Sequence, residues 1–145
     1  MNIKAKSITI DVITALFILL FVYAALSKLS DFEKFKVQLG KSPLILAYAR
    51  WVAWIIPIFE LILAGLLSVK RFQLLGLYAS FSLMVIFSSY IVAILKFSEY
   101  IPCSCGGILE NMSWTEHLIF NSGFVLLGII GVLLYSSNNK RFIVQ

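Results

Sequence analysis

The chain has 145 residues, of which 61% are hydrophobic and 13% are charged, with a formal net charge of +5. A soluble domain of this length does not need so much apolar surface, so the composition indicates a chain embedded in a lipid bilayer. The basic residues lie at the ends of the apolar runs, where they meet lipid headgroups, and are not interleaved with aromatic residues. This pattern excludes nucleic acid as a partner.

Four apolar runs are long enough to cross a bilayer, since a helical span needs about 20 apolar residues. They cover about residues 8–26, 43–69, 72–95 and 115–135. Four spans with short connections use most of the chain, so we predict a single transmembrane domain over residues 1–145. Short connections make neighbouring helices antiparallel, and the predicted fold is an all-α four-helix transmembrane bundle.

The connection between the first two spans is predicted to form a short interfacial helix. Ser30 and Glu33 have the spacing of a capping box, and Gly40 is a fitting end. Apolar residues recur between them at helical spacing, at Phe32, Phe35 and Leu39. Such an amphipathic helix lies in the headgroup region, although a helix covering the bundle has the same pattern.

Further start signals and small residues mark the other spans. Ser42 and Pro43 fit the N-cap and first position of the second span, and Ser113 with Glu116 forms a second capping box before the fourth. Glycines that allow close helix packing are expected in the last two spans, at Gly76, Gly123, Gly128 and Gly131.

The lysines and arginines split evenly between the two sides of this topology. On one side, however, they sit in tight turns and tails at the ends of spans, where the positive-inside rule is strongest. We therefore predict cytoplasmic termini, with the connection between the third and fourth spans facing the periplasm of a bacterial inner membrane.

That last connection contains both cysteines of the chain, Cys103 and Cys105, in the sequence Cys-Ser-Cys-Gly-Gly. Residues two apart lie about 5.5–7 Å apart at Cα, just inside disulfide range. A disulfide across so small a ring is strained, hence labile, and suits a donor of oxidising equivalents. A static disulfide, two idle thiols and a Cu(I) site remain alternatives, since thiolates are suitable ligands for Cu(I).

His117 is the only histidine and lies in the first turn of the fourth span. A helix N-terminus favours a neutral, proton-accepting imidazole, which could take a proton from a thiol or bond to a quinone carbonyl. Asn121 lies one turn deeper on the same face. An ordinary polar residue at a helix end is the alternative interpretation of His117.

Arg50 and Glu60 are costly inside a span, and ionisable residues in such positions are functional candidates. Glu60 is expected near the bilayer midplane, either protonated or paired with an unidentified group. Arg50, Trp51 and Trp54 together resemble an interface belt. With His117 they are predicted to form a flat apolar slot for a quinone, which would be bound by Arg50, Trp54, Glu60 and Asn121.

Three pieces of sequence, taken in order, resemble the MauE/DoxX family of small four-helix bacterial membrane proteins. They are the Leu-Ser-Lys-Leu run at 26–29, the Pro57 to Gly65 segment around Glu60, and the Cys-x-Cys run at 103–107. Ala25 stands where the family commonly has glycine. The resemblance implies that Cys103 and Cys105 are the family's paired cysteines and that Glu60 is its intramembrane acid.

The resemblance further implies a role in making or maintaining disulfides beside thioredoxin-like partners, as in the MauE branch, whereas the DoxX branch includes a subunit of a thiosulfate:quinone oxidoreductase. The predicted function is thiol–disulfide exchange with a periplasmic thioredoxin-like protein through Cys103 and Cys105, with His117 assisting and electrons leaving to quinone. The alternatives are a non-enzymatic subunit or scaffold that binds other membrane subunits through its structure, and a Cu(I)-binding membrane protein.

Overall fold

The computed structural model describes residues 3–42, 45–97 and 113–143. Within these residues four helices are long and apolar enough to cross a membrane, which confirms the all-α transmembrane fold. The elements are α1 (Ile3–Ser30), α2 (Phe32–Gly40), the 3₁₀ turn η1 (Leu46–Tyr48), α3 (Ala49–Ser68), α4 (Gln73–Phe97) and α5 (Trp114–Ile143). The short α2 is the helix that the sequence predicts in the first connection.

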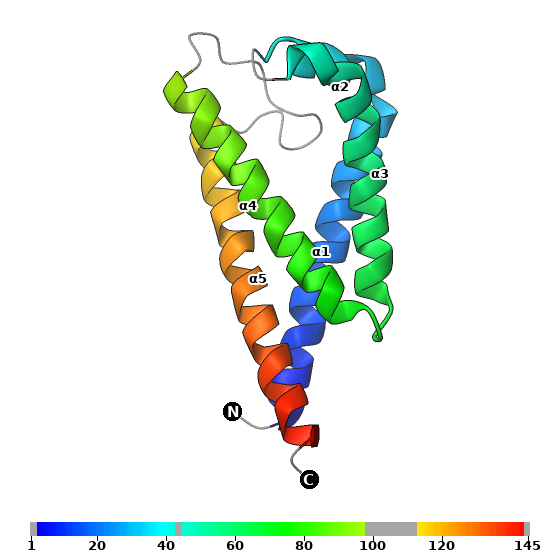
Figure 1. Ribbon diagram of the computed structural model, residues 1–145, viewed down its shortest axis with the longest axis vertical. Coiled ribbons are helices and arrows are strands. Elements are labelled where there is room, and N and C mark those ends of the chain that lie inside the picture. Colours follow the sequence, from blue (N-terminus) through cyan, green and yellow to red (C-terminus); the bar gives the residue numbers. More distant parts are fainter. Residues whose placement is uncertain (1–2, 43–44, 98–112, 144–145) are drawn as a thin grey trace.

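The bundle consists of two antiparallel helix pairs, α1 with α3 and α4 with α5 (Figure 1). The start of α1 and the end of α5 lie together, where Lys6 Nζ donates a hydrogen bond of 3.1 Å to Ser137 Oγ. From that end the two pairs diverge, and α2 lies across the opposite end against α3 (Figure 1). The end of α4 and the start of α5 are at this α2 end.

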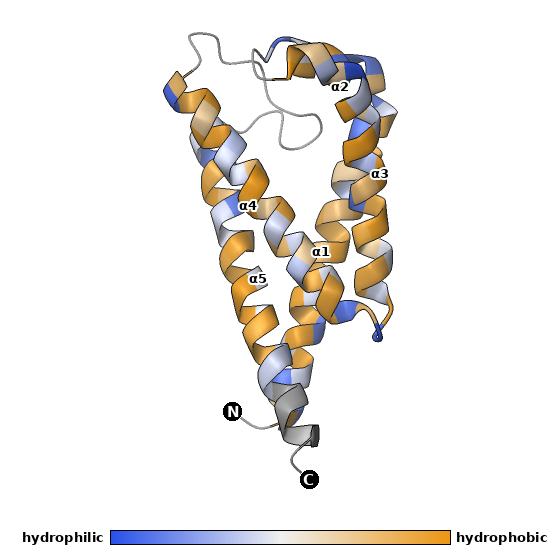
Figure 2. Cartoon of the chain, in the orientation of Figure 1, coloured by the Kyte–Doolittle hydropathy of each residue, from blue (hydrophilic) through white to orange (hydrophobic). Residues whose placement is uncertain are grey.

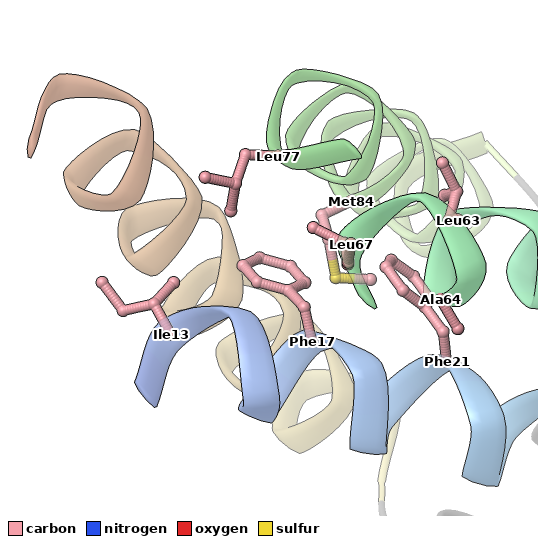
Figure 3. Packing of buried hydrophobic residues seen from close by; sticks show 8 residues of the cluster. All are labelled: Ile13, Phe17, Phe21, Leu63, Ala64, Leu67, Leu77 and Met84. Carbon is pink, nitrogen blue, oxygen red and sulfur yellow. The ribbon is translucent and has the colours of Figure 1, made fainter. Parts of the chain in front are cut away.

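The core sits where the two pairs are close. Phe17 and Phe21 of α1 are fully buried, and they pack with Leu63 and Leu67 of α3 and Leu77 of α4 (Figure 3). These positions recur at three- and four-residue spacing, so each helix buries a single stripe. The remaining faces are also largely apolar (Figure 2), as expected for helices surrounded by lipid.

The predicted capping box at Ser30 is wrong. α1 continues through Ser30, and only Asp31 separates it from α2. An N-cap residue needs a non-helical backbone, which Ser30 as the last residue of α1 does not have. Asp31 takes the N-cap position, and no side-chain capping hydrogen bond forms there.

The second span begins later than predicted, because a 3₁₀ turn precedes α3. The carbonyl of Ser42 accepts hydrogen bonds from the N–H groups of Ile45 and Leu46, so Ser42 belongs to a turn and does not cap α3. Pro43 lies outside the described residues. α3 continues through Pro57 to Ser68.

The capping box at α5 is confirmed. The Ser113 N–H donates to Glu116 Oε2 at 2.7 Å, and the Glu116 N–H donates to Ser113 Oγ at 3.3 Å. Three glycines are close to a neighbouring helix as expected, at Gly76, Gly128 and Gly131. Gly123 is not, because a Cβ there would meet nothing within 4 Å.

Candidate functional site

A buried ion pair joins α1 to α3. Lys28 Nζ donates to Glu60 Oε1 at 2.8 Å and to Glu60 Oε2 at 3.1 Å. Lys28 is 8% exposed and Glu60 is 1% exposed. Lys28 Nζ also lies 3.4 Å from the carbonyl oxygen of Ala24, a third oxygen close to the ammonium group. Glu60 is therefore paired, and its partner, which the sequence did not identify, is Lys28.

Helical spacing explains how the two residues meet. Lys28 continues the buried stripe of α1 that contains Phe21 and Ala25, and Glu60 continues the stripe of α3 that contains Pro57 and Leu63. Because α1 and α3 pack along these stripes, the two side chains face each other across the interface. Lys28 is also in the last turn of α1, where the helix dipole favours a cation.

The short helix α2 covers this pair. The ring of Phe35 in α2 lies with its centroid 5.8 Å from Lys28 Nζ, and both Phe35 and Leu39 are buried against α3. α2 therefore has its apolar face on the bundle and its charged face outward, with Glu33 and Lys36 forming an exposed pair at 2.7 Å.

A cavity of about 330 Å³ lies beside the ion pair, between the two helix pairs. Its walls are mainly aliphatic and aromatic, with contributions from every long helix and from α2; they include Phe21, Leu39, Val52, Met84, Phe87 and Phe120. Among the described residues, the polar ones that line it are few: Lys28, Glu60, Tyr90, His117 and Asn121.

Two of these polar groups are buried without a hydrogen-bond partner in the described part of the chain: His117 Nδ1 and Asn121 Nδ2. Both residues lie on the cavity-facing side of α5, one turn apart, and Asn121 is only 3% exposed. A buried donor left without an acceptor costs about 1–3 kcal/mol, so these groups are ones that a ligand would satisfy.

Arg50 and Trp54 are placed elsewhere. Both are exposed, as is Trp51, and none of the three is among the residues that line the cavity. Arg50 and Trp54 each follow a buried residue of α3 by one position, which turns them about 100° away from the stripe of Glu60. Trp54 packs instead on Phe32 of α2, with ring centroids 4.6 Å apart. The structure thus brings Glu60, His117 and Asn121 together without Arg50 or Trp54.

Cys103 and Cys105 lie outside the described residues. The segment that contains them, 98–112, joins Phe97 at the end of α4 to Ser113 before α5. Both of these residues are at the α2 end of the bundle (Figure 1), and Trp114, the first residue of α5, lines the cavity.

Residues 6–134 match the family model of methylamine utilisation protein MauE. The chain belongs to the MauE family. The match covers most of the four spans and includes the Lys28–Glu60 pair and both cysteines, and with the four apolar helices it identifies a multi-pass membrane protein. The DoxX side of the resemblance stays a prediction. Searches of curated proteins and of solved structures find no match.

Within this MauE-family chain, Lys28 is the site residue that the sequence reasoning missed. The sequence predicts that the first span ends near residue 26, which leaves Lys28 outside it, whereas α1 extends to Ser30. The available signal was its spacing: Lys28 follows Phe21 and Ala25 at seven and three residues, on the same helix face.

Proposed function

We propose that this MauE-family protein is a thiol–disulfide redox protein of the bacterial inner membrane, with quinone as its electron acceptor. A thiolate of a periplasmic thioredoxin-like partner attacks the Cys103–Cys105 disulfide and forms a mixed disulfide. The partner's second thiolate then displaces the cysteine of this chain, leaving the partner oxidised and Cys103 and Cys105 as a dithiol. The dithiol passes two electrons and two protons to a quinone, which becomes a quinol as the disulfide reforms.

The observation that carries this proposal is the position of the cavity. It lies at the end of the bundle where the cysteine-containing segment leaves α4 and enters α5, and it is apolar with a few converging polar groups. Such a site suits a lipid-soluble ligand. Two cysteines give a single pair, so an acceptor has to reach this end of the bundle for the disulfide to reform.

The topology supports the proposed orientation. The first turn of α1 and the last turn of α5 lie together, away from the α2 end (Figure 1). The N-terminal region and the α5 end carry Lys4, Lys6, Lys140 and Arg141. With these cations in the cytoplasm, the cysteine-containing segment begins and ends on the periplasmic side.

The test uses the purified protein in liposomes with and without ubiquinone. A reduced thioredoxin-like protein is added outside, and its thiols are counted with time. We expect thiol loss, with an equal amount of ubiquinol formed, only when ubiquinone is present. Cys103→Ser and Cys105→Ser should each abolish the reaction, whereas Ser104→Ala should retain it.

The alternative functions predict different results. A scaffold with structural cysteines gives no quinone-dependent thiol loss, and a Cu(I) protein purifies with stoichiometric copper that Cys103→Ser removes. In intact cells, a membrane-impermeant maleimide should label the chain only after mild reduction. Labelling that is possible only from the cytoplasmic side contradicts the proposed orientation and the exchange with a periplasmic partner.

A further inference from the structure

We propose that the cavity binds a neutral molecule with a carbonyl headgroup and an apolar body, which enters from the lipid between α3 and α4 and is recognised by Asn121 and His117. The proposal deepens the proposed function, because a quinone is such a molecule. Binding itself does not depend on Cys103 or Cys105, so the two proposals can fail separately.

The size and walls of the cavity define the body of the ligand. A volume of about 330 Å³ is at the small end of ligand pockets in proteins, which range over about 300–1,000 Å³. The walls are apolar and include aromatic rings from three helices, those of Phe21, Phe87 and Phe120. A flat ring with apolar substituents fits such walls and leaves no polar group of its own unsatisfied against them.

The charge of the cavity argues for a neutral ligand. The only oppositely charged residues that line it within the described chain are Lys28 and Glu60, and they neutralise each other at 2.8 Å. Lys28 Nζ is already bonded to both oxygens of Glu60, so the pair offers no net positive charge to an anionic headgroup. Arg50, the other cation of α3, is exposed and does not line the cavity.

The unpartnered groups define the headgroup. Asn121 Nδ2 is a donor and therefore needs an acceptor, which a carbonyl oxygen provides. His117 Nδ1 donates or accepts according to its tautomer, so it can bond to a carbonyl or to the hydroxyl that replaces it after reduction. Both groups are one turn apart on α5 and line the same cavity as the Lys28–Glu60 pair.

The lining of the cavity also shows how a ligand reaches it. Ile86 of α4 lines the cavity and has 60% of its surface exposed, so it lies at the boundary of the cavity and is not enclosed by the bundle. Val52 and Ile56 of α3 line the facing wall and are half-buried. α3 and α4 are joined by a tight turn at residues 69–72 and diverge from it (Figure 1). The side chains between the cavity and the lipid are thus apolar, which favours a membrane-dissolved ligand.

Binding is tested in the variant with Cys103→Ser and Cys105→Ser, which has no cysteine left. The probe is a short-chain ubiquinone, and the signal is quenching of tryptophan fluorescence, since Trp114 lines the cavity. We expect saturable quenching. Asn121→Leu should weaken binding about tenfold, the effect of one lost hydrogen bond of about 1.4 kcal/mol. Laurate, an anion with an apolar chain, should compete poorly.

The access route is tested by blocking it. In the same cysteine-free background, Ile86→Cys is alkylated with N-cyclohexylmaleimide, and Leu75→Cys serves as the matched control. Leu75 is 58% exposed on the same helix and does not line the cavity. Alkylation should slow ubiquinone association at least tenfold for Ile86→Cys and leave the rate unchanged for Leu75→Cys.

Three results overturn the proposal. They are non-saturable quenching, unchanged ubiquinone affinity in Asn121→Leu, and laurate binding more tightly than ubiquinone. Should Asn121→Leu fail to elute as a monodisperse helical protein, the alkylation experiment decides: equal association rates for the two alkylated variants overturn the access route. Ubiquinone binding without quinone-dependent thiol loss retains this proposal and refutes the proposed redox function.

Discussion

Removing one partner of the Lys28–Glu60 pair should destabilise the protein far more than removing both. The two side chains are almost completely buried and joined at 2.8 and 3.1 Å, so Glu60→Leu leaves an ammonium group whose one remaining oxygen contact among the described residues is the Ala24 carbonyl at 3.4 Å. Leaving one buried charge unpaired costs about 3–5 kcal/mol. Lys28→Met should cost a similar amount, because the Glu60 carboxylate then loses its only hydrogen-bond donor within the described residues.

The double variant, Lys28→Met with Glu60→Leu, replaces both charges by apolar side chains of similar volume. Such replacements of buried pairs are typically neutral or stabilising by about 1–4 kcal/mol. The expected effects are therefore non-additive: the two single losses together amount to about 6–10 kcal/mol, so the coupling free energy is about 6 kcal/mol or more. Because Lys28 and Glu60 also line the cavity, the double variant separates the stability of the bundle from any role of the charges in ligand binding.

Thermal unfolding in detergent measures these differences. About 2–4 °C of melting temperature corresponds to 1 kcal/mol for a chain of this size, so each single variant should melt roughly 6–20 °C lower than wild type. The double variant should melt close to wild type. If the two single losses simply add in the double variant, the pair makes no coupled contribution and our account of the α1–α3 interface is refuted.

Two further predictions concern packing and surface charge. Gly76→Ala should destabilise by about 1 kcal/mol or more, because its Cβ would lie 3.0 Å from Leu67 Cδ2 and 3.1 Å from the Leu67 backbone nitrogen. The control, Gly65→Ala, should stabilise by about 0.5–1 kcal/mol, because its Cβ would meet nothing within 4 Å. Equal melting temperatures for the two variants would contradict the close approach of α3 and α4. Asp11 of α1 forms an ion pair with Lys70, and the two side chains are 50% and 72% exposed. Asp11→Asn should therefore lower the free energy of unfolding by less than about 1 kcal/mol. A decrease as large as that of Glu60→Leu in the same melting experiments would contradict this expectation.

The spans were predictable because a bilayer imposes a length on apolar runs that sequence alone reveals. The capping box at Ser113 was predictable because its hydrogen bonds join residues within one stretch of four consecutive positions. The same pattern at Ser30 predicted a cap that does not form, because α1 continues through Ser30 almost to the start of α2. The four residues of the pattern do not reveal whether the preceding helix has ended.

The pairing in the site could not be predicted in the same way. Glu60 was recognisable as a costly residue, but its partner lies 32 residues away on another helix. Both residues belong to the short motifs that carry the family resemblance, and only the packing of α1 on α3 brings the motifs together. The rotation of a residue about its helix is equally hard to predict: Arg50 follows buried Ala49 by one position, which turns it away from the cavity.

The cavity and the unpartnered amide of Asn121 both lower the stability of the described part of the bundle, and a bound ligand would remove both costs. In lipid, close packing is a main stabilising contribution between helices, so the described helices lose contacts with one another where they border a cavity of about 330 Å³. The unpartnered Asn121 Nδ2 adds a further cost at the same place. Both costs are concentrated at the end of the bundle where the cysteine-containing segment is attached, and a bound neutral carbonyl compound would relieve both at once. This coincidence favours a binding site over a packing defect.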